Sequence, residues 1–386
     1  MLLLWIACAA PPTQAPPPTL GPTVQLVPGD GLPPEVSPQD ANNNLDVAWF
    51  QGRVYLAFRT APSHVASAET VLYVVSSAAQ QTWDYEASVA VQTDLREPRF
   101  LAWDHKLFLY MAVLGDSPTD FEPQGSLVTV TEGGGVWTEP VDVFEPGFIA
   151  WRARVLDGVP YVIGYTGGEN LYEADAEPVR VSWLTTQDGL QWEGVIPDQP
   201  VVLEGGGSET DFTFLDDGAL VAVVRNEAGD ETGYGSKICR AEAEDLGTWT
   251  CAADPKKYDS PLVFRRGEQV WLVARRNVTE TGNYDLGYTD LDMEQQSAAY
   301  ALDYWQQPKR CSLWRVDPDA LRVEHALDLP SRGDTCFPSI LDLGPRLSVI
   351  YNYSSPLDGP DLSWIDGQTG TTGIYATSGI WPDGTW

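Results

Sequence analysis

Residues 97–113 read EPRFLAWDHKLFLYMAV, and residues 125–144 read GSLVTVTEGGGVWTEPVDVF. Together they hold four short apolar or alternating runs, separated by the turn DHK, by a loop and by a glycine-rich turn that ends in a tryptophan. Short runs of this kind, bounded by turn residues and without helical periodicity, are typical of β-strands. These residues therefore predict one unit of four strands.

A tryptophan closes a similar polar turn at four regularly spaced positions, Trp83, Trp137, Trp192 and Trp249. The spacings are 54, 55 and 57 residues (137−83, 192−137 and 249−192). A regular period with four strands in each unit indicates a β-propeller blade, whereas a tandem of smaller β-domains would not be so even. Six strand pairs open the units, at residues 48–58, 100–111, 154–165, 212–224, 263–274 and 339–351. We therefore expect an all-β, six-bladed β-propeller of four-stranded antiparallel blades.

The ends of the chain predict how this ring closes. The sixth unit is incomplete at its C-terminal side, and a strand around PTVQLVP (residues 22–28) would complete it and leave no long edge exposed. We expect a signal-like segment and proline-rich tether over residues 1–22, and a single propeller domain over residues 23–386. The fifth unit carries a longer insert at residues 278–310.

Residues 1–22, MLLLWIACAAPPTQAPPPTLGP, resemble a bacterial lipoprotein signal, in which Cys8 is the lipidated residue. The apolar segment is short and no Lys or Arg precedes it, so an ordinary secretory signal or an incorrectly chosen start codon is the alternative. The resemblance implies an exported protein, either attached to the bacterial cell envelope or extracellular.

Four cysteines remain beyond Cys8, and an even number in an exported chain suggests disulfides. The simplest pairing joins sequence neighbours, Cys239 with Cys251 and Cys311 with Cys336. Free buried thiols are the alternative.

The formal charge of −32 excludes several classes of partner. It repels nucleic acids and anionic membrane surfaces, so we expect no nucleic-acid partner and membrane contact only through a lipid anchor. No CxxC or His/Cys spacing indicates a zinc site, and we expect a monomer without metal or cofactor. The Asp-rich segment 355–370 could hold a structural calcium ion, but its spacing is not that of an EF-hand and a solvated loop is the simpler interpretation.

The tryptophan turns resemble degenerate Asp-boxes, the S-x-D-x-G-x-T-W turns of sialidases (neuraminidases) and related propellers. At Trp192, Thr185 and Gly189 stand at box positions, and at Trp83 the box serine is Ser76. Because these boxes stabilise a turn, the resemblance implies a sialidase-like propeller and says nothing about activity.

Residues 208–230, SETDFTFLDDGALVAVVRNEAGD, carry a second resemblance. In sialidases a glutamate starts the innermost strand of the fourth blade and an arginine ends the next strand, both beside the central channel. Glu209 and Arg225 resemble that pair, which implies that Glu209 polarises a tyrosine nucleophile and that Arg225 helps to bind a substrate carboxylate. A structural ion pair is the alternative.

Arginine also recurs at equivalent strand ends in the other units, which predicts a cluster at one end of the channel. An inter-blade salt-bridge network formed by Arg96, Glu97 and Arg99 is the alternative to a ligand role. The expected substrate-binding residues are Arg59, Arg96, Arg99, Arg225, Arg275 and Arg276.

The chain departs from the sialidase pattern in three places. Asn44 stands where the first arginine is expected, and the loop of residues 61–70 holds His64 and Glu69 where an acid/base aspartate is expected. Phe337 occupies the expected position of the nucleophilic tyrosine, which leaves Tyr351 or Tyr353 as the replacement. With Asp46 as the first-blade carboxylate, the expected catalytic residues are Asp46, Glu209 and Tyr351.

The resemblance implies a glycoside hydrolase, exo-sialidase-like and retaining, that acts on a glycan or acidic sugar. One alternative is a non-catalytic propeller that binds a surface glycan or a protein partner. Another is a five-bladed furanosidase-like hydrolase, for which Glu97 beside Pro98 would matter.

Overall fold

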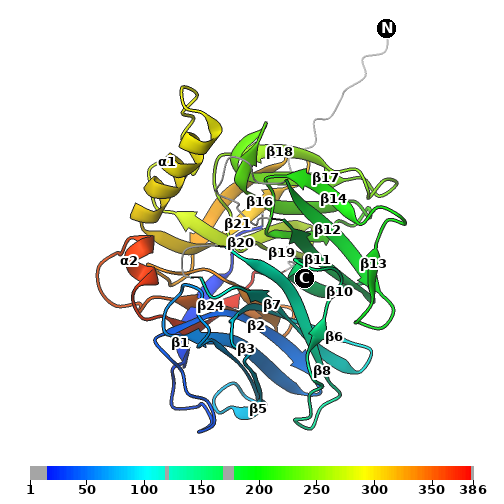
Figure 1. Cartoon of the computed structure of the whole chain (residues 1–386), viewed down its shortest axis with the longest axis vertical. Helices are drawn as coiled ribbons and strands as arrows, with labels where there is room; N and C mark the ends of the chain where they lie inside the picture. The colour runs from blue at the N-terminus through cyan, green and yellow to red at the C-terminus, as the bar shows by residue number, and fades with distance from the viewer. Residues whose placement is uncertain (1–14, 118–120, 168–177, 384–386) are drawn as a thin grey trace.

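The computed structural model describes residues 15–117, 121–167 and 178–383, and these form a ring of six antiparallel sheets (Figure 1). Blade one consists of β2 (Ala41–Phe50), β3 (Arg53–Ala61), β4 (Val71–Ser77) and β5 (Asp84–Val89), and blade two of β6 (Asp94–Trp103), β7 (Lys106–Leu114), β8 (Pro123–Thr131) and β9 (Val141–Asp142). Blade three consists of β10 (Ile149–Leu156), β11 (Val159–Thr166), β12 (Val179–Thr186) and β13 (Trp192–Gly194), and β14 (Val201–Gly205) also pairs with β12.

Blades four to six complete the ring. Blade four consists of β15 (Thr210–Phe214), β16 (Leu220–Asp230), β17 (Gly233–Ala241) and β18 (Thr250–Asp254), and blade five of β19 (Leu262–Arg266), β20 (Gln269–Asn277), β21 (Lys309–Asp317) and β22 (Arg322–Asp328). Blade six consists of β23 (Ser339–Asp342), β24 (Leu347–Ser354), β25 (Gly373–Ile380) and β1 (Thr19–Val27). The predicted six-bladed propeller of four-stranded blades is confirmed.

The first strands contact one another in five of the six neighbouring pairs of blades, so these strands line the central channel. In blades one to three they turn into the second strand through two residues that both have positive φ. This geometry is that of type I′ turns, whose twist matches the twist of the paired strands. The turn pairs are Gln51-Gly52, Asp104-His105 and Asp157-Gly158.

Closure of the ring depends on the N-terminal strand. β1 pairs with β25 from Thr19 opposite Ile380 to Val27 opposite Ile374, so that the sixth blade takes its outermost strand from the start of the chain. The predicted closure is confirmed, and β1 begins inside the range that the sequence assigned to the tether.

Three of the four tryptophan turns, those of Trp83, Trp137 and Trp192, contain a hydroxyl six residues before the tryptophan; Ala243 stands at that position before Trp249. Ser77 and Thr186 each accept backbone N–H groups of the turn and donate to a carbonyl at its end, and Thr131 accepts the N–H of Gly133. The aligned box residues bond elsewhere, Ser76 to Glu86 and Thr185 to the carbonyl of Pro160. The turns therefore recur, but their polar contacts are offset by one residue from the Asp-box alignment.

Both predicted disulfides are present. Cys239–Cys251 joins β17 to β18 within blade four, and Cys311–Cys336 joins blade five to the segment that enters blade six. Two disulfides fit an exported or extracellular protein. Cys8 lies outside the described residues.

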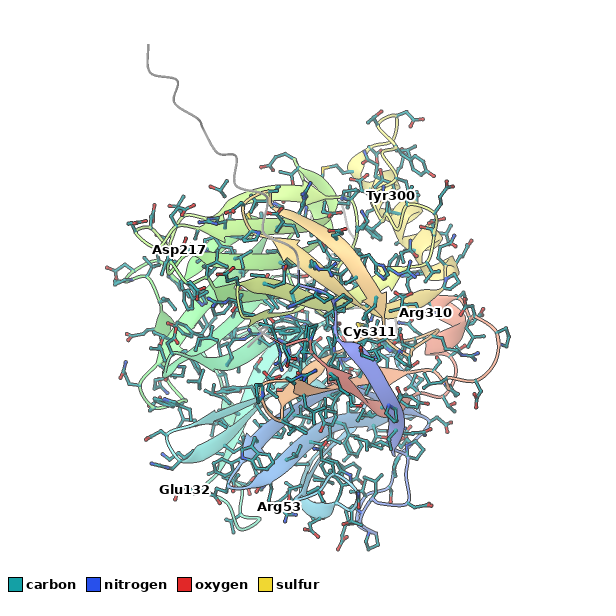
Figure 2. The ribbon with its side chains drawn as sticks, turned by 180° about the vertical axis from the view of Figure 1, so that it is seen from behind. Arg53, Glu132, Asp217, Tyr300, Arg310 and Cys311 are labelled. Atoms are coloured by element: carbon teal, nitrogen blue, oxygen red, sulfur yellow. A yellow bond between two sulfur atoms is a disulfide. The ribbon has the colours of Figure 1, made fainter. Side chains whose placement is uncertain are left out.

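The insert in blade five contains a helix that the strand pattern did not predict. α1 (Met293–Gln306) begins at a capping box formed by Asp292 and Gln295, and it buries Tyr300 and Tyr304. It lies against the short α2 (Trp364–Gln368). Figure 2 shows α1, marked by Tyr300, at the rim of the ring opposite Arg53 and Glu132. None of the described helices is long and apolar enough to cross a membrane.

Two valines on β1 test the importance of closure. Val27 is fully buried, whereas Val24 on the same strand is 56% exposed. We expect Val27→Ala to lower the free energy of unfolding by about 2 kcal/mol, because it removes buried methyl groups from the core shared with blades one and six. Val24→Ala is the matched control and should change it by less than about 0.5 kcal/mol. Urea denaturation measures both, and equal effects would contradict a stabilising role for β1.

Candidate functional site

A cavity of about 200 Å³ lies at the end of the channel where first strands begin and second strands end. All six blades or their connecting loops contribute to its wall. The lining residues are Asn44, His64, Arg96, Glu97, Leu114, Phe121, Tyr165, Ser208, Glu209, Arg225, Glu227, Lys257, Asp259, Ser260, Arg275, Phe337, Tyr353 and Trp364.

Irregular backbone turns two polar side chains into this cavity. Asn44 and Glu97 have φ values of +40° and +56°, and each lies at a register shift in the first strand of its blade. A bulge re-aims a side chain that a regular strand would direct into the sheet packing. Non-glycine residues in this left-handed region are uncommon and are frequent at functional sites.

Arg225 lies at the centre of the charged part of the wall. Its Nη1 is 2.8 Å from Oε1 of Glu209, 3.0 Å from Oε2 of Glu227 and 3.6 Å from Oδ1 of Asp259. Its Nε donates to the hydroxyl of Ser208 at 3.1 Å. One guanidinium therefore faces three carboxylates in a buried setting.

Two further cations share those carboxylates. Lys257 Nζ lies 2.6 Å from Oε1 of Glu227 and 3.5 Å from Oδ1 of Asp259, and Arg275 Nη1 lies 2.9 Å from Oδ2 of Asp259. Tyr304, from α1, donates its hydroxyl to the same Asp259 oxygen at 2.6 Å. The cluster therefore balances three positive against three negative side chains.

The two carboxylates beside Arg225 titrate differently. Burial raises the pKa of Glu209 to about 7, and Asp259 and Glu97 oppose its ionisation further, although Arg225 favours it. Burial alone would also raise the pKa of Asp259, but Lys257, Arg275 and Arg225 hold it well below its usual range. Glu209 is therefore the member of the cluster that takes up a proton near neutral pH.

Glu97 is a second carboxyl group with an unusual environment. It is buried, and its Oε2 makes no hydrogen bond with any described residue. Burial raises its pKa, opposed by the nearby charges of Arg96, Arg99 and Arg225. The ring of Tyr165 also lines the cavity, and Glu97 and Glu209 are among the charges that act on its hydroxyl.

Between blades one and two, Asp94 pairs with two arginines. Its Oδ1 lies 2.8 Å from Nη2 of Arg59, and its Oδ2 pairs with Arg96. Arg59 is fully buried behind the wall, whereas Arg96 reaches the cavity.

The structure brings together four of the expected site residues, Glu209, Arg96, Arg225 and Arg275, around one cavity. The arginines come from blades two, four and five. Each of them also has a carboxylate partner, so the cavity is charge-balanced although arginines gather around it.

Two expected catalytic residues lie outside the cavity. Asp46 is two residues beyond the Asn44 bulge, where Oδ2 accepts the backbone N–H of Phe100 and Oδ1 accepts the hydroxyl of Ser339, so it joins three blades. Tyr351 is two residues from Tyr353 along β24, and a strand advances roughly 7 Å over that distance. Its hydroxyl bonds Gln80 and not a cavity residue.

Three expected arginines also lie outside the cavity wall. Arg276 follows Arg275 on β20, and successive strand residues point to opposite faces, so it pairs with Asp328 at 2.7 Å. Arg99 is fully buried, with its guanidinium between the rings of Trp151 (4.8 Å) and Phe337 (4.1 Å). Arg59 is the third, buried against Asp94 as described above.

Several wall residues carried no clear signal in the sequence. Lys257 and Asp259 lie in the connection between blades four and five, and Trp364 begins α2. None of the three lies in a strand, so neither strand alternation nor the repeat predicts their direction. Among the described residues, no group of three or more His, Cys, Asp or Glu side chains is arranged to hold a metal ion.

No protein-family model matches the chain, and no curated protein matches it significantly. Solved structures do resemble it. A protein of unknown function from Dyadobacter fermentans DSM 18053 superposes with a TM-score of 0.62 at 14% identity, over 89% of this chain and 95% of that chain. Trypanosoma rangeli sialidase in complex with the inhibitor DANA superposes with a TM-score of 0.58 at 11% identity, over 88% of this chain and 55% of that one.

The same sialidase in complex with sialic acid superposes with a TM-score of 0.54 at 11% identity, over 88% of this chain and 54% of that one. The chain thus spans about half the length of the trypanosomal sialidase chains. The protein has the six-bladed β-propeller fold of the sialidases and is a divergent example of it. Identities this low establish the fold and leave the activity to be argued from the site.

The charge balance predicts the effect of removing Arg225. We expect Arg225→Gln to lower the free energy of unfolding by about 3–5 kcal/mol at pH 8, because three buried carboxylates lose their shared cation. The loss should be smaller at pH 5, where Glu209 is protonated and no longer needs that cation. Chemical denaturation at the two pH values measures this.

A matched control is Arg322→Gln, since Arg322 is 73% exposed and pairs with Asp317 at 3.4 Å. Its effect should stay below about 1 kcal/mol at either pH. A pH-independent loss for Arg225→Gln would contradict the role assigned to Glu209.

Proposed function

We propose that the protein is a glycoside hydrolase of sialidase-like architecture that acts on acidic glycans at the mouth of the channel. The observation that carries this proposal is the meeting of three guanidinium groups from three blades with two carboxyl groups of raised pKa around one cavity. The arginines are Arg96, Arg225 and Arg275, and the carboxyl groups belong to Glu97 and Glu209.

Each part of this wall suits one requirement of the reaction. Guanidinium groups bind a substrate carboxylate through paired, charge-assisted hydrogen bonds. Glycoside hydrolysis passes through an oxocarbenium-ion-like transition state, which a facing carboxylate stabilises. Glu97 supplies a carboxyl group for that task, and the rings of Tyr165 and Trp364 supply flat surfaces for a sugar.

The balanced charges of the wall also favour a particular mode of binding. At pH 8 Glu209 is ionised and occupies Arg225, so an incoming carboxylate competes with it. Protonation of Glu209 removes the negative charge of one of the three carboxylates that share this guanidinium, so a substrate carboxylate can take its place. An acidic sugar should therefore bind together with a proton.

A non-catalytic glycan-binding propeller is the second candidate, and two wall residues favour it. Asn44 and Phe337 line the cavity at the positions where the sialidase resemblance expects an arginine and a tyrosine. Such a protein would keep the arginines for binding and lack turnover.

Hydrolysis assays separate the two candidates. We expect the purified protein to cleave at least one aryl glycoside from a panel with sialic acid, glucuronic acid and galactose as the sugars. Glu97→Gln should lower kcat/KM at least 100-fold, a loss typical of removing one group that stabilises transition-state charge. If no glycoside is cleaved while a glycan array shows saturable binding, the non-catalytic candidate is correct.

The pH dependence of binding is a separate prediction. Because the pKa of Glu209 is raised to about 7, the affinity for a free acidic monosaccharide should rise roughly tenfold from pH 8 to pH 6. Calorimetry in two buffers with different ionisation enthalpies should detect proton uptake at pH 7. Glu209→Gln should abolish both effects, and an affinity that is flat with pH in the unaltered protein would contradict the binding mode.

A further inference from the structure

The cavity contains a histidine–aspartate pair that has no role in the function proposed above. His64 lines the cavity, and its Nδ1 lies 2.6 Å from Oδ2 of Asp334, a carboxylate that is fully buried. The two residues are 270 positions apart, in a loop of blade one and in the segment that enters blade six. Closure of the ring brings them together.

The surroundings of Asp334 hold it ionised and fixed. Burial alone would raise its pKa, but His64, Arg275 and the hydroxyl of Tyr353 together lower it below its usual range. Its Oδ1 accepts the Tyr353 hydroxyl at 2.9 Å, and its backbone N–H donates to the Ser355 hydroxyl at 3.1 Å. An ionised carboxylate at this distance accepts the Nδ1–H of the imidazole.

The backbone on both sides of His64 is also held. Arg59 donates to the carbonyl oxygens of Ser63 at 3.3 Å and Val65 at 3.0 Å, and Arg96 donates to the carbonyl of His64 at 3.3 Å. The imidazole therefore has a fixed position in the cavity wall.

The free nitrogen of the imidazole distinguishes this pair from a structural ion pair. With Nδ1 directed at Asp334, Nε2 makes no hydrogen bond with any residue that the structure describes. At the other histidine–aspartate pair, His325 uses its Nε2 to contact Asp328 at 2.9 Å, on a surface outside the cavity wall. Only the His64 pair combines an orienting carboxylate with a cavity among the described residues.

We infer that His64 is the general acid and base of the glycoside hydrolysis proposed above, and that Asp334 is the residue that positions it. This inference depends on that proposed function. The protonated imidazole gives its Nε2 proton to the glycosidic oxygen as the bond to the anomeric carbon breaks, so the aglycone leaves as an alcohol. The neutral Nε2 then takes a proton from the water that attacks the anomeric carbon, which yields the free sugar and restores the imidazolium.

Asp334 acts through the tautomer and the ring orientation. By accepting the Nδ1–H it keeps the reactive lone pair or proton on Nε2, the nitrogen that is free at the cavity. Without the carboxylate the ring can adopt the other tautomer, in which Nε2 of the neutral imidazole cannot accept a proton.

Substrates with different leaving groups provide the test. We expect His64→Asn to lower kcat/KM by 10²- to 10⁴-fold for an aryl glycoside with a poor leaving group such as phenol, because that oxygen needs a proton. The loss should be less than tenfold for a dinitrophenol glycoside of the same sugar, whose leaving group needs none. Imidazole added to His64→Gly should restore part of the lost activity.

Two variants make the outcome specific. His105→Asn is the matched control, since His105 is an exposed turn residue outside the cavity wall, and it should leave both substrates unaffected. Asp334→Asn should reproduce the leaving-group dependence of His64→Asn, and circular dichroism shows whether it still folds. If His64→Asn lowers the two rates equally, or leaves them unchanged while the unaltered protein is active, the inference fails and the proposed function stands. If the unaltered protein cleaves neither substrate, both fail.

Nitrogen NMR gives a second measurement that needs no activity. The chain has three histidines, so His64→Asn assigns the His64 imidazole signals. We expect the neutral ring to carry its proton on Nδ1 in the unaltered protein and to lose that preference in Asp334→Asn. A neutral ring protonated on Nε2 in the unaltered protein would overturn the inference.

Discussion

Buried carboxylates hold the first strands of neighbouring blades together, and the positions of the cavity residues depend on them. Asp46 accepts the backbone N–H of Phe100 in the next blade, and Asp211 accepts that of Val263. Glu209 accepts the N–H of Ser260 in the same manner, at the cavity itself. Each bond satisfies a donor that the sheets leave unpaired at the channel, where an orphaned group would cost roughly 1–3 kcal/mol. The same type of interaction thus supports the ring and sets the geometry of the wall.

This arrangement explains how a chain of net charge −32 maintains arginines at its centre. Each of the three arginines that line the cavity, Arg96, Arg225 and Arg275, has a carboxylate partner, since burying a charge without a partner is costly. The positive and negative side chains of the wall balance, and its net charge changes when one of its carboxylates takes up a proton. Glu209, with its pKa raised to about 7, is the group through which that change occurs.

The sequence predicted the fold well because the fold repeats. The strand pair recurs six times and the tryptophan turn four times, so an error in a single element does not alter the result. Each site residue occurs once and is not repeated from blade to blade, so its prediction depends on its position along a single strand. Arg276 lies one residue from the cavity residue Arg275 and so points to the opposite face of its strand. Asp46 and Tyr351 each lie two residues from a cavity residue, at a different depth in the channel. The bulge at Glu97, the loop at His64 and the helix α1 interrupt the repeat, so no periodic pattern could place them.

The direction of β1 has a consequence for how the molecule presents its cavity. The strand ends at Val27 beside the start of β25, which is the cavity end of blade six, and therefore begins at the opposite face of the ring. Arg315 binds the carbonyl of Ala15 at that face, which fixes the point of entry. If the chain were anchored to a surface through residues before Ala15, the face opposite the cavity would lie nearest that surface. The mouth of the channel would then open away from it, into the surrounding medium.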